Sequence, residues 1–167
     1  EDTDSPKFQG TKTNTSFDSN ANALTLTNPA TNSSGEYAFN SVLDLGGVFS
    51  LDLKRHFLSE GFYIGTLFDS RTALIDTWTD FDGADATAVN AKLLVATTQD
   101  DPSSNSATFT AFQTFANGTY KGRGFKFKTE LTTADPAQNI RISQLGYTAT
   151  LLRRIEQSNL LVANGST

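Results

Sequence analysis

The stretch covering residues 109–151 constrains the fold more than any other part of the 167-residue chain. In it Phe125 and Phe127 alternate with lysines, and Ile140 and Ile142 alternate with polar residues. An apolar residue at every second position is typical of a β-strand with one buried face and one solvated face. The pattern therefore predicts antiparallel strands that pack as a β-sandwich.

Two irregularities predict where these strands bend. At Ser143-Gln144 the alternation slips by one position before Leu145 continues it, which indicates a β-bulge with one extra residue. Within the apolar segment 42–57, Gly46 and Gly47 are adjacent. Two adjacent glycines would cost a helix about 1 kcal/mol each relative to alanine. We therefore expect two strand segments joined by a bend at these glycines.

Short strand-like runs separated by turn residues continue along the rest of the chain and predict an all-β fold in one domain. We assign residues 1–22 to a polar arm or linker because they lack sustained periodicity. Residues 23–154 form the β-sandwich domain, and residues 155–167 form a C-terminal extension or interface segment. Its apolar run, residues 160–162, would need a partner surface in this chain or another.

Composition excludes several classes of function. The net charge of −5 argues against nonspecific binding of nucleic acid, which needs a basic surface. The chain has no Cys, so it has no disulfide and no thiolate metal site. No run reaches the roughly 20 apolar residues of a membrane-spanning helix. His56 is the single histidine and ends an apolar run, which favours a strand-end or surface role over catalysis.

Several fragments resemble two known groups of protein domains. Residues 35–37 (GEY) and 43–46 (LDLG) resemble the opening of galactose-binding-like, discoidin-type jelly-roll domains. Residues 97–102 (TTQDDP) precede a second pattern similar to the C-terminal region of tail-tip host-specificity proteins and central tail fibres of tailed bacteriophages. This second pattern reads Phe109, Phe112, Phe115, Gly118, Tyr120, Arg123, Phe125, Phe127, Leu131, Asp135, Ile140, Ile142 and Leu145. Phe109 and Phe112 replace tryptophans of that pattern, and we expect their rings to fill the same core space.

The resemblance implies an antiparallel β-sandwich of the jelly-roll, galactose-binding-like type. It also implies a non-catalytic module of a phage tail tip or fibre, located in the virion and extracellular, that contributes to host-surface attachment through a glycan or a protein. Such tail proteins are usually homotrimers in contact with other tail proteins. Two alternatives remain open: a purely structural tail component, and a carbohydrate-binding module of a larger glycan-degrading enzyme.

The candidate ligand-binding residues are aromatic rings and two arginines. A sugar face stacks on an aromatic ring while polar side chains bind its hydroxyls, so Trp78, Tyr63, Tyr120 and Phe81 are candidate platforms, and Arg71 and Arg123 are candidate hydrogen-bond donors. Trp78 lies within an alternating run, where a core position is the stronger interpretation. Arg123, like Arg71, could instead pair with nearby acids.

The loop Asp80-Phe81-Asp82-Gly83-Ala84-Asp85 is the candidate metal site. Loop carboxylates are the usual ligands of Ca²⁺, so Asp80, Asp82 and Asp85 could hold a structural calcium ion. A solvated turn is the simpler interpretation, because the loop lacks the closing glutamate of an EF-hand. The acids at residues 100–101 fit ordinary turn chemistry before proline.

A glycosidase would need two carboxyl groups facing one cleft. Asp76, Asp80, Asp82 and Glu130 supply carboxyl groups, but nothing in the sequence singles out a pair. We therefore do not expect an enzyme.

Overall fold

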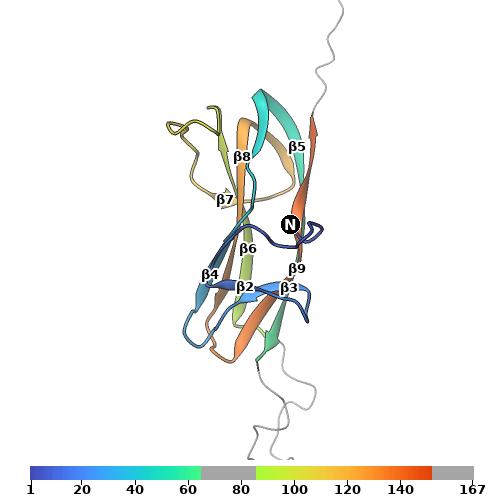
Figure 1. The fold of residues 1–167 in the computed structure, drawn as a ribbon, viewed down its shortest axis with the longest axis vertical. Helices are drawn as coiled ribbons and strands as arrows, with labels where there is room; N and C mark the ends of the chain where they lie inside the picture. Colours follow the sequence, from blue (N-terminus) through green and yellow to red (C-terminus); the bar gives the residue numbers. More distant parts are fainter. Residues whose placement is uncertain (65–85, 152–167) are drawn as a thin grey trace, which may run out of the picture.

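The computed structural model describes residues 1–64 and 86–151, and the regular structure in these ranges is entirely β-strand. The strands pair antiparallel throughout (Figure 1). Their bounds are β1 Thr11–Thr13, β2 Thr15–Asp18, β3 Ala23–Leu26, β4 Ser34–Ala38, β5 Leu43–Tyr63, β6 Val89–Thr98, β7 Gln113–Thr114, β8 Gly118–Thr133 and β9 Gln138–Leu151.

The strands form two layers, and the long strands β5, β8 and β9 run along the molecule (Figure 1). One layer contains β6, the C-terminal half of β8, β4 and β1. The other contains β5, β9, β3 and β2. Because β5 also pairs with β8, the sheet is nearly closed on itself. This all-β, antiparallel, jelly-roll-like sandwich confirms the predicted fold class.

At one end of the molecule β5 and β8 bend together from one layer into the other (Figure 1). The pairing of β5 with β8 shifts between Asp44 and Phe49, so residues 45–48 bulge out opposite Arg123. Gly46 has a φ of 72°, a left-handed conformation that glycine adopts without a steric penalty. We call residues 44–49 and 122–124 the arch. The predicted bend at the two glycines is confirmed.

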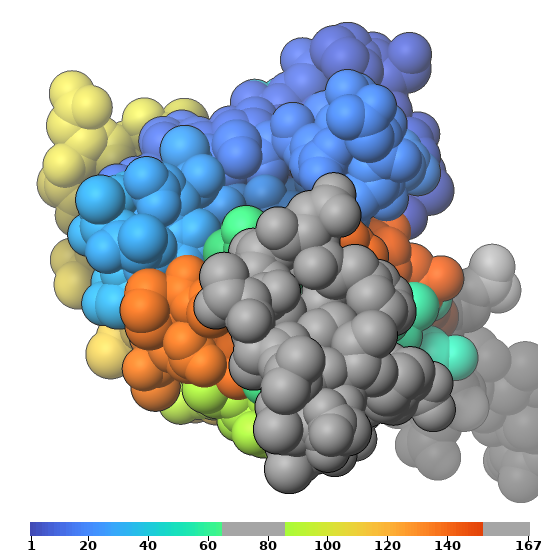
Figure 2. All heavy atoms as spheres, turned by 90° about the horizontal axis from the view of Figure 1, so that it is seen from below, coloured from blue at the N-terminus to red at the C-terminus, as the bar shows by residue number. Residues whose placement is uncertain are grey.

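The N-terminal segment is part of the sandwich, which corrects the expected polar arm or linker over residues 1–22. β1 pairs with β4 in one layer, and β2 pairs with β3 in the other. Asn14, with a φ of 53°, makes the corner between β1 and β2. Phe8 is completely buried, and Figure 2 shows the N-terminal residues, in blue, lying against the rest of the chain. The segment lacks periodicity because its strands are only three and four residues long.

The core lies between the two layers and is made of alternate residues from most of the strands. Phe125 is 0% and Phe127 2% exposed, as their alternation with lysines predicts. The predicted bulge in β9 is also confirmed: Leu58 pairs with Gln144 but Ser59 pairs with Ile142, which leaves Ser143 as the extra residue. The fully buried large side chains are Tyr37, Phe8, Phe115, Phe125, Leu24, Leu26, Leu51, Leu53, Leu93, Leu131, Ile142 and Leu145.

The expectation that Phe109 and Phe112 fill the core is wrong. Phe112 is 42% exposed, and Phe109 is only partly buried. The ammonium of Lys126 lies 4.0 Å from the centre of the Phe109 ring, and that of Lys128 lies 4.9 Å from the centre of the Phe112 ring. These lysines alternate with the buried phenylalanines of β8, so the two rings cover the outer face of the sheet. Cation–π attraction favours this position.

Candidate functional site

Most of the residues expected to bind a ligand lie outside the described part of the chain. These are Arg71, Trp78 and Phe81, together with the candidate calcium ligands Asp80, Asp82 and Asp85. Asp76, from the possible glycosidase carboxyls, lies there too, as do residues 152–167 and therefore the whole proposed C-terminal extension. Of the ligand-binding candidates, the structure describes Tyr63, Tyr120 and Arg123, and the Tyr63 hydroxyl accepts a hydrogen bond from the Gln138 side-chain amide (3.1 Å).

Tyr120 supports the turn that precedes β8. Its hydroxyl donates a hydrogen bond to the Ala116 carbonyl (2.9 Å) and accepts one from the Ala116 N–H (3.3 Å). Its ring meets the buried Phe115 ring edge-on, with centroids 5.9 Å apart. Both polar functions of the hydroxyl are therefore engaged by the protein.

Arg123 pairs with acids instead of projecting toward a ligand site. Its guanidinium lies 3.2 Å from the Asp44 carboxylate and 2.7 Å from the Asp101 carboxylate. Asp44 also accepts a hydrogen bond from the Gly46 N–H (2.8 Å). The Gly46 N–H and the Arg123 guanidinium hold the pKa of Asp44 below its usual value. These contacts fix the arch.

Within residues 1–64 and 86–151, no three His, Asp or Glu side chains lie close enough to hold a metal ion. Asp100 accepts a hydrogen bond from the Thr108 N–H, and Asp101 accepts two from Ser103, so both act in turns. Glu130 forms an ion pair with Lys128 (2.8 Å). These three acids thus have structural partners.

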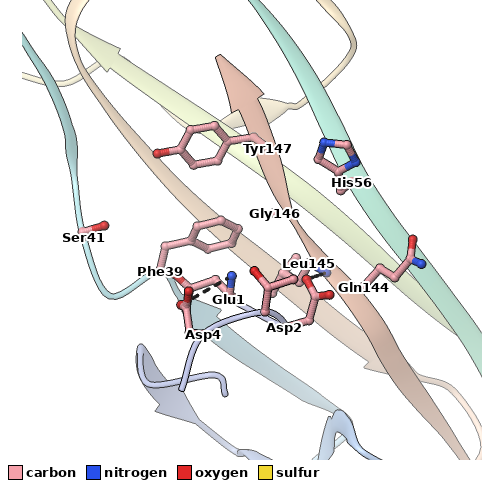
Figure 3. Close-up of a pocket in the computed structure, with 11 residues that line it drawn as sticks. Glu1, Asp2, Asp4, Phe39, Ser41, His56, Gln144, Leu145, Gly146 and Tyr147 are labelled. Atoms are coloured by element: carbon pink, nitrogen blue, oxygen red, sulfur yellow. Dashed lines mark hydrogen bonds and ion pairs between the residues drawn. The ribbon is translucent and has the colours of Figure 1, made fainter. Parts of the chain in front are cut away.

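A hollow of about 550 Å³ lies where the first four residues pass the edge of β9 (Figure 3). Three parts of the chain line it: the N-terminal residues, the segment after β4, and the paired strands β5 and β9. Asp2 anchors the N-terminal side, because its carboxylate accepts a hydrogen bond from the Leu145 N–H (2.8 Å). The hollow therefore depends on contacts between residues more than 140 positions apart.

Two aromatic rings form one wall of the hollow. Phe39 and Tyr147 lie nearly parallel, with an interplanar angle of 22° and centroids 6.2 Å apart. Behind them the Phe127 ring stacks on Tyr147 at 4.2 Å, so core packing holds the wall in place. Burial raises the pKa of the Tyr147 phenol, and the Glu1 carboxylate raises it further. Among the described residues the Tyr147 hydroxyl has no hydrogen-bond partner, which leaves it able to bind a ligand.

Polar side chains surround these rings. Gln144 and Ser41 reach the hollow from β9 and from the segment after β4 (Figure 3). The Glu1 carboxylate is already engaged, because it accepts hydrogen bonds from the Tyr37 hydroxyl and from the Asn40 N–H. Aromatic faces beside amide and hydroxyl groups are the chemistry that a neutral sugar requires: ring stacking plus hydrogen bonds to its hydroxyls.

His56 reaches the hollow from β5, in the middle of the strand and not at its end. One ring nitrogen lies 2.7 Å from the Thr148 hydroxyl. Within the described residues this is its only side-chain hydrogen bond, so no carboxylate orients the imidazole as in a catalytic triad. The surface position agrees with the sequence prediction.

A second hollow, of about 360 Å³, lies beside β1, β4 and β8. Its lining includes Thr13, Asn14, Glu36 and Glu130, and no aromatic ring. The first hollow differs from it in two ways: it has the two aromatic rings, and it is lined by Gly146, where an added Cβ would meet no atom within 4 Å. Of the two, the first is better suited to a sugar.

Compared with protein-family models, curated proteins and solved structures, the chain gives no significant match. Over the residues that the structure describes, no helix is long and apolar enough to cross a membrane. The fold and the hollow are therefore the observations from which a function can be argued.

Sequence reasoning missed the residues of this hollow. Phe39, His56 and Tyr147 come from separate strands or connections, and no motif links them. One signal was present: Gly146 follows the predicted bulge and precedes an aromatic residue, a place where the backbone is open to a ligand.

Proposed function

We propose that this chain is a non-catalytic module of a bacteriophage tail tip or fibre that contributes to host-surface attachment by binding glycan. The tail assignment, with its virion location, galactose-binding-like classification and contacts to other tail proteins, rests on the sequence resemblance. The glycan contact rests on one observation: the Phe39 and Tyr147 rings line a hollow together with hydrogen-bonding side chains. Sandwich folds host many functions, so the fold alone does not indicate glycan binding, and the support comes from the hollow.

The experiment uses two glycines in strands, Gly146 within β9 and Gly118 at the start of β8. Gly146→Leu fills the hollow, since an added Cβ meets no atom within 4 Å there. Gly118→Leu is the matched control, because its site is equally open but lies at the start of β8, away from the hollow. We expect the purified chain to bind a defined glycan on an array and to bind cells carrying it. Gly146→Leu should abolish this binding, and Gly118→Leu should retain it.

A structural role in the tail is the second candidate, and one observation favours it. The Glu1 and Asp2 carboxylates in the hollow are spent on hydrogen bonds within the chain. No binding to any glycan or cell by a folded, assembled chain would favour this role. Binding that Gly146→Leu leaves unchanged would move the glycan contact elsewhere in the chain. A fusion to a glycan-degrading enzyme in the parent protein would favour the carbohydrate-binding module.

A further inference from the structure

On the side facing away from β5, the C-terminal part of β9, after Leu145, is unpaired within the described residues. β3 pairs with β9 only at Arg141 and Ile142, and Asp2 binds the Leu145 N–H. Beyond this point, in the part of the chain that the structure describes, β9 pairs with β5 on one side and with no strand on the other. A row of free backbone donors and acceptors is a template for adding another strand.

The backbone geometry fixes which groups face this open side. In a regular antiparallel strand, the N–H and C=O of one residue point to the same side, and successive residues alternate. The Leu145 N–H points away from β5, because it meets Asp2. The backbone groups of Tyr147, Ala149 and Leu151 therefore point outward as well.

This edge also differs from the other free edges in charge. Residues 144–151 carry no charged side chain. In contrast β1 carries Lys12, β2 carries Asp18 and the N-terminal part of β8 carries Lys121, all on strands with one unpaired side in the described residues. Charged residues on edge strands protect proteins against edge-to-edge association. The β9 edge lacks this protection.

The uncharged edge is complementary to a second copy of itself. With Ala149 placed on a two-fold axis, its outward N–H and C=O meet those of the other copy. Tyr147 then lies opposite Leu151 of the second copy, and Thr148 opposite Thr150. Aromatic–aliphatic and Thr–Thr cross-strand pairs both stabilise antiparallel sheets. Leu151 is 56% exposed, so this contact would also cover apolar surface.

We propose that the β9 edge from Tyr147 to Leu151 pairs antiparallel with the same edge of a second copy, which gives a two-fold dimer with one continuous sheet. The contact is isologous and closed, so it forms a dimer and not a fibre. It goes beyond the proposed glycan binding and does not depend on it. The dimer would contain two hollows, one on each side of the two-fold axis.

Light scattering on the full chain tests the dimer. We expect a mass of twice the 18.0 kDa of the chain. Ala149→Asp places two carboxylates against each other at the axis and should reduce the mass to that of one chain, whereas Ala149→Val should leave the dimer intact. Circular dichroism must show that both variants remain folded. A single-chain mass for the wild type at the highest concentration, or the three-chain mass that the resemblance implies, overturns the proposal.

Cysteine cross-linking tests the register even if Ala149→Asp fails to fold. The chain has no Cys, so a single introduced thiol can pair only between copies. Hydrogen-bonded partners in an antiparallel pair have Cα atoms about 5.5 Å apart, within the range of about 4.4–6.8 Å that a disulfide spans. Under mild oxidation Ala149→Cys should therefore give a covalent dimer in high yield.

Gly118→Cys is the matched control for this cross-link. Gly118 pairs with Leu53, which pairs with Ala149, so the two copies of residue 118 lie five strand spacings apart. At about 4.8 Å per spacing this separation is roughly 24 Å, too far for a disulfide. Equal cross-linking of the two variants, or a dimer that Ala149→Asp does not dissociate, would show that another surface forms the contact.

Discussion

The sandwich and the arch are held together by different forces. The sandwich buries large apolar side chains between its layers, and Leu24, Phe125 and Ile142 are completely inaccessible to solvent. The arch instead exposes Val48 (42%) and Phe49 (50%), and its shape depends on a left-handed glycine and on Arg123. Apolar burial thus decides the stability of the whole domain, whereas the arch only sets the path of two strands between layers.

The largest test of this comparison removes a phenylalanine ring from each region. Phe127→Ala leaves a cavity in the core beside Phe115 and Tyr147, and should destabilise the domain by about 3–5 kcal/mol. Phe49→Ala in the arch removes a ring that is half exposed and should change stability by no more than about 0.5 kcal/mol. Urea unfolding of both variants measures the two values. Equal losses would show that the arch is part of the core.

The sandwich also contains a buried polar contact that should matter. The Tyr37 hydroxyl accepts a hydrogen bond from the Gly10 N–H (2.8 Å) and donates one to Glu1. Tyr37→Phe leaves that N–H without its partner, which should cost about 1–3 kcal/mol at neutral pH. Urea unfolding at pH 7 checks this loss. An unchanged stability would show that water replaces the hydroxyl.

Alkaline pH gives the same contact a second signature. Burial, and then the hydrogen bond with Glu1, raise the pKa of Tyr37 above its ordinary value of 10.0. Because the native pKa is the higher one, the stabilisation is fully present below pH 10 and is lost as the pH rises. We expect wild-type stability to fall above pH 10 and Tyr37→Phe to fall less steeply. Tyr147, whose pKa burial also raises, accounts for part of the remaining slope.

In the arch, the backbone of Gly46 is the sharpest single position. Its φ of 72° is strained for any residue with a Cβ, although an added Cβ would meet no atom within 4 Å. Gly46→Ala should therefore cost roughly 1 kcal/mol through backbone conformation alone. Gly118→Ala is the control: it is equally open but without positive φ, and should be stabilising by about 0.5–1 kcal/mol. Thermal melts of Gly46→Ala and Gly118→Ala separate the cost of backbone strain from the gain that comes from a less flexible unfolded chain.

Regular alternation made the long strands of the sandwich predictable from sequence. Phe125 and Phe127 in β8 and the bulge at Ser143 in β9 follow from local patterns, because side-chain period and phase are properties of the strand itself. The bend in the arch was predictable for a similar reason, since the adjacent Gly46 and Gly47 disfavour a helix in this segment. Features of this kind can be predicted without knowing which strands pair with each other.

The remainder depends on tertiary contacts that periodicity does not encode. Phe8 is buried because its ring packs against Phe17 of β2 and Tyr37 of β4, contacts that no local pattern shows, so residues 1–22 were misassigned as an arm. Phe112 was expected in the core because it replaces a tryptophan of the tail-protein pattern, but its ring lies on the outer face of the sheet, against the ammonium of Lys128. The hollow joins residues 1–4 to β5 and β9, and no local pattern indicates a site of that kind.

The smallest effect we predict is the acid sensitivity of the arch. Hydrogen bonds from Gly46 and Arg123 lower the pKa of Asp44, and hydrogen bonds from Ser103 together with Arg123 lower that of Asp101, both from an ordinary value of 3.8. Because the native pKa values are the lower ones, the stabilisation is present above about pH 4 and disappears as the pH falls through them.

Arg123→Gln removes the cation that both carboxylates share. We expect a small decrease in the melting temperature at pH 7, because all three groups are partly or fully accessible to solvent, which screens their attraction. The difference from wild type should shrink toward zero as the pH falls below 4, since protonated carboxyls no longer attract the guanidinium. Lys121→Gln, at an exposed position two residues away, controls for the lost charge. A difference that persists in acid would mean that Arg123 supports the arch by packing its side chain, and the arch would then resemble the sandwich more closely than its charges indicate.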